Sequence, residues 1–97
     1  MKNFAFEWDE VKAQANLRKH GVSFEEAATV FAEGGAPIDG DIAHSIGEDR
    51  FIIIAISERQ RLLTVAFTYR DEAVRIISAR RANRREQHIY EQEKRSD

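Results

Sequence analysis

The feature that most constrains the fold is a run of six apolar residues at positions 51–56, Phe-Ile-Ile-Ile-Ala-Ile. Successive residues of a strand point to opposite faces, so a strand that is apolar throughout has both faces covered and belongs inside a sheet. Two further strand-like segments follow at 62–69 and 74–79. The connections at 58–60 and 70–72 are too short for a crossover, so these segments predict an antiparallel meander.

The chain before the meander carries signals for a strand and a helix. Residues 4–8 place an aromatic side chain at every second position, which predicts a short first strand with one buried face. Asp9 is suited to cap a helix that runs to about His20, and Gly21 is suited to end it.

A second helix is predicted by the capping-box spacing of Ser23 and Glu26. An apolar residue every three or four positions follows, and the pair Gly34-Gly35 ends the pattern. Residues 36–49 are expected to form a loop, with a short edge strand near Ile38.

A last helix is predicted after the meander, because Asn83 and Glu86 repeat the capping spacing and a helical pattern continues to about Lys94. The expected order is a strand, two helices, three meander strands and a helix. We therefore expect one α+β domain over residues 1–97, with an antiparallel sheet of three to four strands.

Composition excludes several classes of protein. The chain has no cysteine, which excludes disulfide scaffolds, cysteine-bound metal sites and a thiol nucleophile. Glu7 comes too early for a signal peptide, and the longest apolar run is too short to cross a membrane, so we expect a cytoplasmic protein. The three histidines have unrelated spacings and no glycine-rich phosphate loop is present, so no metal or cofactor is expected.

Charge is distributed unevenly along the chain. Residues 1–49 carry a net charge of −6 and residues 50–97 carry +4, and ten of the eleven basic residues in the second half are arginine. Arginine forms bidentate hydrogen bonds with phosphate and stacks on bases. The pattern is equally compatible with phosphate contact and with a solvated, charge-paired surface.

The densest basic segment is 78–85, where the last meander strand is expected to end and the final helix to begin. In this strand, alternation places Arg75 on one face with Ile77 and Ala79. Because a buried charge is costly unless it is paired, Arg75 requires either a carboxylate partner from residues 1–49 or an open cleft that binds phosphate.

Four other side chains have both a structural and a functional interpretation. Trp8 is either a core anchor or a platform for base stacking, and Tyr69 is either a core residue or a stacking residue. Lys19 and His20 close the first helix, where a cation complements the helix dipole. His20 is also a candidate general acid or base, because histidine titrates near neutral pH.

Two long segments in the same order resemble a known family. The first contains Phe6-Glu7-Trp8-Asp9, Lys12, Asn16 and Lys19-His20-Gly21-Val22-Ser23-Phe24-Glu25-Glu26-Ala27. The second contains Arg75-Ile76-Ile77-Ser78-Ala79-Arg80-Arg81-Ala82, Arg85-Glu86 and Tyr90. Between them lie Arg50-Phe51, Ser57 and Arg61-Leu62-Leu63-Thr64-Val65. Together these segments resemble the BrnT family of toxins over nearly the whole chain.

The resemblance implies a RelE-like fold and a function. BrnT proteins are toxins of bacterial type II toxin–antitoxin pairs that cleave RNA and inhibit translation and growth. The implied partners are RNA and a BrnA-like antitoxin, whose own DNA-binding part contacts operator DNA. A dimer within that complex is also expected.

Roles for individual residues follow from the chemistry of RNA cleavage without a metal ion. The 2′-hydroxyl attacks the phosphate, whose developing charge arginine can stabilise. Arg80 and Arg75 are predicted to stabilise the scissile phosphate, and His20 to transfer protons. The residues predicted to bind RNA around them are Trp8, Lys19, Arg61, Tyr69 and Arg81. The alternative is a non-catalytic binding module in a repressor complex, whose arginines meet an acidic antitoxin.

Overall fold

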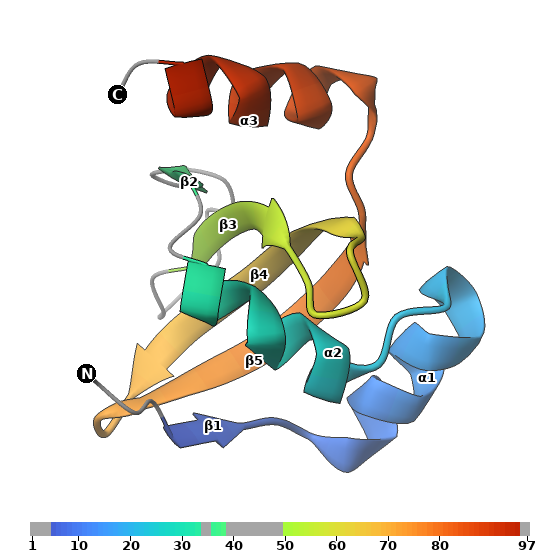
Figure 1. Ribbon diagram of the computed structural model, residues 1–97. Helices are drawn as coiled ribbons and strands as arrows, with labels where there is room; N and C mark the ends of the chain where they lie inside the picture. The colour runs from blue at the N-terminus through green and yellow to red at the C-terminus, as the bar shows by residue number, and fades with distance from the viewer. Residues whose placement is uncertain (1–4, 34–35, 39–49, 96–97) are drawn as a thin grey trace.

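The computed structural model describes residues 5–33, 36–38 and 50–95 of the chain. The predicted helix end at Gly34-Gly35 and most of the predicted loop, 39–49, lie outside the described residues. Figure 1 shows the path of the chain, whose elements are β1 (Ala5–Glu7), α1 (Glu10–His20), α2 (Phe24–Thr29), the 3₁₀ helix η1 (Val30–Glu33), β2 (Ala36–Ile38), β3 (Phe51–Ile56), β4 (Leu62–Arg70), β5 (Ala73–Arg81) and α3 (Arg84–Arg95).

The strands form one mixed sheet in the order β1-β5-β4-β3-β2. The predicted meander is confirmed, and β3 lies between β4 and β2, inside the sheet. The expectation of a purely antiparallel sheet of three to four strands needs correction, because β1 adds to β5 in parallel and gives a fifth strand. Two α-helices, one 3₁₀ helix and three strands of the described chain separate β1 from β5, so no tight turn forces antiparallel pairing.

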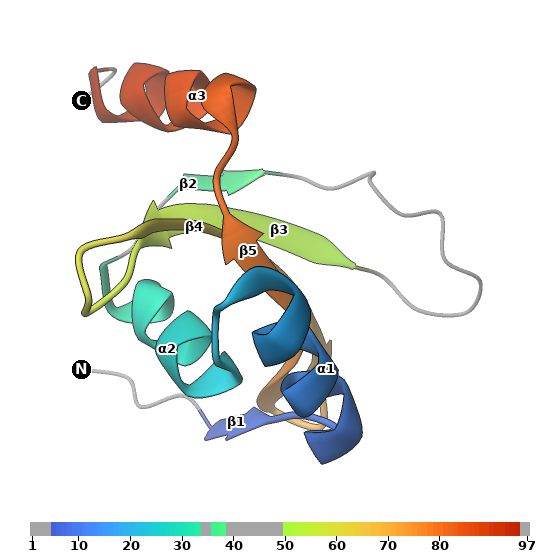
Figure 2. The same cartoon turned by 90° about the vertical axis from the view of Figure 1, so that its right-hand side faces the viewer.

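In the view of Figure 2, α2 lies on one side of the sheet and α3 on the other, near β2 and β3, whereas α1 lies beside β5 (Figures 1 and 2). The main core fills the space between the sheet and α2, and the α+β class is thereby confirmed. Its fully or nearly fully buried side chains are Ala13, Val22, Phe24, Ala27, Val30, Ile53, Ala55, Leu63, Val65, Phe67, Val74, Ile76 and Ala79. Of the described helices, none is both long enough and apolar enough to cross a membrane.

The first two helices begin where local capping signals predict. The Asp9 carboxylate accepts hydrogen bonds from the backbone N–H groups of Val11 and Lys12, and the Ser23 hydroxyl accepts one from Glu26. Gly21 ends α1 in the left-handed conformation, with φ of 71°.

The last helix begins with the predicted capping box. The Asn83 side chain accepts a hydrogen bond from the Glu86 backbone N–H, and the Glu86 carboxylate accepts one from the Asn83 backbone N–H. This reciprocal pair fixes the direction in which the chain leaves β5.

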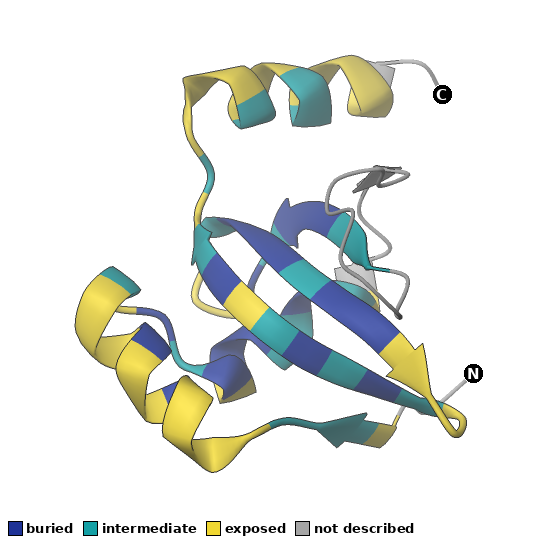
Figure 3. Ribbon diagram, turned by 180° about the vertical axis from the view of Figure 1, so that it is seen from behind, coloured by how far each residue is buried: buried dark blue, intermediate teal, exposed yellow. Residues whose placement is uncertain are grey.

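A β-bulge in β5 overturns one expectation about the faces of this strand. The register steps from Ala66 opposite Ser78 to Phe67 opposite Ile76, which leaves Ile77 as the extra residue. Simple alternation would put Ala79 on the face of Arg75. The extra residue instead returns Ala79 to the core side, where it is fully buried. Figure 3 shows buried and more exposed positions following one another along the strands of the sheet.

Candidate functional site

One end of the sheet brings together four segments that are far apart in the sequence. They are the C-terminal end of α1, the β3–β4 turn, the C-terminal end of β5 and the start of α3. The backbone N–H of Ala82 donates to the Leu62 carbonyl at 2.9 Å, and Arg61 Nη2 donates to the Gly21 carbonyl at 3.1 Å. Positions remote in sequence are thereby held at one end of the fold.

This end carries a concentration of positive side chains, and we call it the basic end. It comprises Lys19, His20, Arg59, Arg61, Arg80, Arg81, Arg84 and Arg85. Five of the eight predicted site residues are therefore gathered here: Lys19, His20, Arg61, Arg80 and Arg81. Glu26 and Glu86 neutralise part of this charge, and the remaining cations favour the approach of polyanions.

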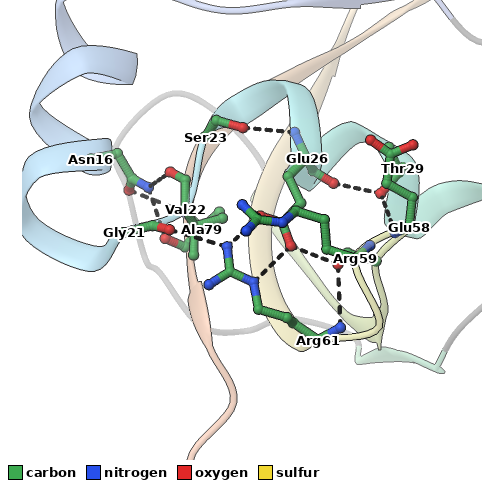
Figure 4. Close-up of polar contacts among 11 residues, drawn as sticks. Asn16, Gly21, Val22, Ser23, Glu26, Thr29, Glu58, Arg59, Arg61 and Ala79 are labelled. Carbon is green, nitrogen blue, oxygen red and sulfur yellow. Dashed lines mark hydrogen bonds and ion pairs between the residues drawn. The ribbon is translucent and has the colours of Figure 1, made fainter.

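Arg61 is anchored in a network around a buried carboxylate (Figure 4). Its Nε donates to Glu26 Oε2 at 3.0 Å, and its Nη2 donates to Glu26 Oε1. The Ser57 hydroxyl also donates to Glu26 Oε2, at 2.6 Å. The Arg61 hydrogen bond holds the pKa of Glu26 below its usual value, although burial acts in the opposite direction. Arg61 thus ties the β3–β4 turn to α2.

Arg80 also meets a carboxylate, on α3. Its Nη1 donates to Glu86 Oε1 at 2.8 Å and its Nη2 to Glu86 Oε2 at 2.7 Å. Burial raises the pKa of Glu86, but hydrogen bonds from Arg80, the Asn83 backbone and Thr64 outweigh it, and the net shift is downward. The pair joins the end of β5 to the first turn of α3.

Arg81 and Lys19 are exposed at the basic end, and His20 is half-buried. Within the described part of the chain, the side chain of Arg81 forms no ion pair. Beside Arg81 lies a groove of about 380 Å³ between α3 and the ends of β3 and β4, whose other lining residues are Ile56, Leu62, Ala82, Gln87, Tyr90 and Glu91. An exposed cation next to a partly apolar groove is suited to contact a phosphate and an adjoining base.

Arg75 lies elsewhere on the same strand. It is five residues before Arg80, which corresponds to about 17 Å along a strand. Its Nη1 contacts Glu7 Oε2 at 3.1 Å, so the carboxylate partner required by the sequence argument comes from β1.

The two predicted stacking residues also lie away from the basic end. Tyr69, near the β4–β5 turn, is 60% exposed and its ring centroid is 5.6 Å from those of Phe51 and Phe67. Trp8 packs its edge against Phe24 and is half-buried against the core. Of the two interpretations of Trp8, a core anchor or a stacking platform, this position fits the core anchor.

The sequence reasoning missed the role of Asn16, which the structure places at the open edge of β5. Its side-chain nitrogen donates to the carbonyls of Ala79 at 2.8 Å and Val22 at 3.0 Å, and its oxygen accepts from the Ala79 backbone N–H at 3.2 Å. The side-chain amide thus replaces a neighbouring strand beyond the end of β1. The sequence signal for this role was Asn16 itself, a polar residue on the inward-facing side of α1, a helix that has few apolar residues.

The described residues contain no group of three or more histidine, aspartate or glutamate side chains placed to bind a metal ion.

Comparison with known proteins assigns the chain to a family. The family model described as the ribonuclease toxin BrnT of type II toxin–antitoxin systems matches residues 8–86. The chain belongs to the BrnT family. The matched span includes every element from α1 to the first turn of α3, and it contains all the predicted site residues. A family of ribonuclease toxins of type II systems implies a ribonuclease toxin with an antitoxin partner.

A solved structure supports the fold of this BrnT-family chain. The crystal structure of the Brucella abortus ribonuclease toxin BrnT is similar with a TM-score of 0.66, at 24% sequence identity, over 84% of this chain and 100% of that chain. No curated protein matches the chain in a sequence search. The predicted resemblance to the BrnT family and the predicted fold class are both confirmed.

Proposed function

We propose that this protein is a toxin that cleaves RNA internally without a metal ion, inhibits translation and growth, and is neutralised by a BrnA-like antitoxin. The observation that carries this proposal is the basic end, where a compact fold with a net charge of only −2 gathers seven lysine and arginine residues. A polyanion is the ligand that such an arrangement attracts most strongly.

The chemistry assigned to this end is transesterification by the RNA itself. The 2′-hydroxyl oxygen attacks the adjacent phosphorus, the 5′-oxygen leaves, and the products carry a 2′,3′-cyclic phosphate and a 5′-hydroxyl. Arg80 stabilises the charge that develops on the phosphate, and His20 transfers protons. Arg81 and Lys19 hold neighbouring phosphates. Each of these roles is a proposal that rests on position and chemical type.

The remaining predicted residues receive supporting roles in this proposal. Arg61 is held by the buried Glu26, and Arg75 lies about 17 Å from Arg80 along β5, so neither is assigned a direct part in the reaction. Tyr69 is exposed enough to stack on a base at a distance from the basic end, whereas Trp8 contributes through the core.

One observation favours the alternative of a non-catalytic binding module. In the free chain, the guanidinium groups of Arg61 and Arg80 are both occupied by carboxylates. A protein that only forms a repressor complex needs no free catalytic guanidinium, and its exposed arginines would contact an acidic surface of the antitoxin.

Expression in bacteria separates these functions. Wild-type protein expressed alone should stop growth and degrade cellular RNA, and co-expression of the antitoxin should restore both. Arg81→Ala should relieve the toxicity. Arg70→Ala removes an exposed arginine at the opposite end of the sheet and should remain toxic. Normal growth with intact RNA, at confirmed soluble expression of wild type, would favour the binding module.

A further inference from the structure

The Glu86 carboxylate is surrounded by four hydrogen-bond donors. Arg80 supplies two, at 2.8 and 2.7 Å, the Thr64 hydroxyl supplies one at 2.9 Å, and the backbone N–H of Asn83 supplies another at 2.9 Å. The Glu86 side chain is 16% exposed, Thr64 is 4% exposed and the Arg80 side chain is 42% exposed. The donors therefore form a partly enclosed site for an anion, which the chain fills with its own side chain.

These donors match a phosphodiester as well as they match a carboxylate. Both groups present two anionic oxygens in one plane with their central atom, and a guanidinium binds either group through two parallel hydrogen bonds. A hydroxyl and a backbone N–H at a helix start are common partners of phosphate oxygens. The negative charge of Glu86 lowers the positive potential of Arg80, so a phosphate gains full access only after Glu86 leaves.

We propose that Arg80, Thr64 and the Asn83 backbone N–H form a binding site for one RNA phosphate, and that Glu86 occupies this site as an internal competitor in the free protein. The inference rests on the proposed ribonuclease function and adds a regulatory element to it. Rotation of the Glu86 side chain, or a shift of the first turn of α3, opens the site. The apparent affinity for phosphate is then the intrinsic affinity multiplied by the fraction of molecules in which the site is open.

The packing of α3 explains why its first turn is able to shift. In the described part of the chain α3 has no fully buried side chain, and most of its residues are exposed (Figure 3). The contacts of Glu86 with Arg80 and Thr64 are therefore prominent among the bonds that join its first turn to the sheet. Displacing Glu86 disturbs this turn without opening the core between the sheet and α2.

The test uses Glu86→Gln, which removes the charge but keeps a residue that suits the capping box. Glu93→Gln is the matched control, because it makes the same charge change at an exposed position of the same helix. Inorganic phosphate is titrated into each protein, and nuclear magnetic resonance follows the Asn83 amide and the Arg80 Nε–H. Glu86→Gln should bind phosphate on the order of tenfold more tightly than wild type and Glu93→Gln. Equal binding by all three proteins would overturn the inference.

A second variant covers the case in which Glu86→Gln does not fold. Glu86→Asp keeps the charge but withdraws the carboxylate by one methylene group, so it should also bind phosphate more tightly than wild type. If the folded Glu86→Asp protein binds phosphate no better than wild type, the inference fails on this evidence alone.

RNA cleavage by the same proteins separates the two proposals. If the phosphate titration distinguishes Glu86→Gln from the control but no variant cleaves RNA, the anion site stands and the ribonuclease function fails. If every protein cleaves RNA but phosphate binding is identical, the ribonuclease function stands and the role assigned to Glu86 fails.

Discussion

Glu26 shows at the scale of single residues how one carboxylate determines the role of a neighbouring arginine. It is 3% exposed and sits between α2 and the β3–β4 turn, where Arg61 and Ser57 donate to its oxygens. A buried carboxylate without a partner is strongly unfavourable, so the Arg61 guanidinium is needed where it is. A residue that the sequence places among RNA contacts is therefore also a structural residue.

Replacement of Arg61 by alanine should lower the free energy of unfolding by about 3 kcal/mol, because it removes the hydrogen-bonded guanidinium that compensates the buried charge of Glu26. Arg59→Ala is the matched control. Arg59 is 67% exposed and its Nη1 is 3.9 Å from Glu26 Oε1, so its removal should cost less than about 0.5 kcal/mol. Urea denaturation measures both values, and similar stability of the two variants would show that the Arg61 contacts do not hold the turn.

The same pair makes stability depend on pH. The pKa of Glu26 is lower in the folded protein than in the unfolded chain, so the folded state binds fewer protons. The contribution is complete above the unfolded pKa, about 4.3, and is lost as the pH falls through the folded-state value. Urea denaturation should show wild type more stable than Glu26→Gln near neutral pH, with a difference that shrinks below about pH 4.3. A difference independent of pH would contradict this.

The candidate site was predictable only in part. The arginines near the end of β5 stand out in the sequence, but their carboxylate partners do not. The acid that pairs with Arg61 is 35 positions earlier, and the acid that pairs with Arg75 is 68 positions earlier. Such partners are defined by tertiary structure, whereas spacing along the chain reveals only local pairs. Glu86 was recognised as a capping residue, but its contact with Arg80 was not.

At the scale of elements, helix caps and tight turns were predictable from the sequence because they depend on residues that are close together along the chain. Asp9, Ser23 and Asn83 each cap the helix that follows them, and the two meander turns fall where polar residues interrupt apolar runs. The bulge at Ile77 and the parallel pairing of β1 were not predictable in this way. Both depend on which distant strand lies alongside, which periodicity does not encode.

The β4–β5 turn offers a test of local backbone strain. Asp71 and Glu72 both have positive φ, 50° and 70°, as the two central residues of a type I′ hairpin do. Asn-Gly is the preferred pair in such a turn, so the double change Asp71→Asn and Glu72→Gly should raise the free energy of unfolding by about 1 kcal/mol. Urea denaturation measures the gain.

A glycine placed in the other turn provides the control for this change. Glu58 lies in the β3–β4 turn and does not have a positive φ, so Glu58→Gly should lower stability by about 0.5 kcal/mol through backbone entropy. If the Asn-Gly hairpin is less stable than wild type, the positive φ values are not a source of strain.

At the scale of the whole molecule, the fold converts a charge gradient along the sequence into a localised surface. The acidic first half supplies β1, α1 and α2, and the basic second half supplies the meander and α3. Part of the positive charge is neutralised by Glu7, Glu26 and Glu86, and much of what remains exposed lies at the basic end. Net charge alone would have hidden this surface, because the chain as a whole is slightly acidic.

Cleavage of RNA by the purified protein is the most direct test of the central claim, that this chain is a metal-independent ribonuclease whose basic end binds RNA. Wild-type protein is incubated with end-labelled RNA in the presence of a chelator, and the product ends are identified. The account predicts fragments that end in a 2′,3′-cyclic phosphate, with equal cleavage by Arg70→Ala and cleavage slowed on the order of 100-fold by folded Arg80→Ala. Intact RNA after incubation with folded wild-type protein, or cleavage that stops when metal ions are chelated, would contradict it.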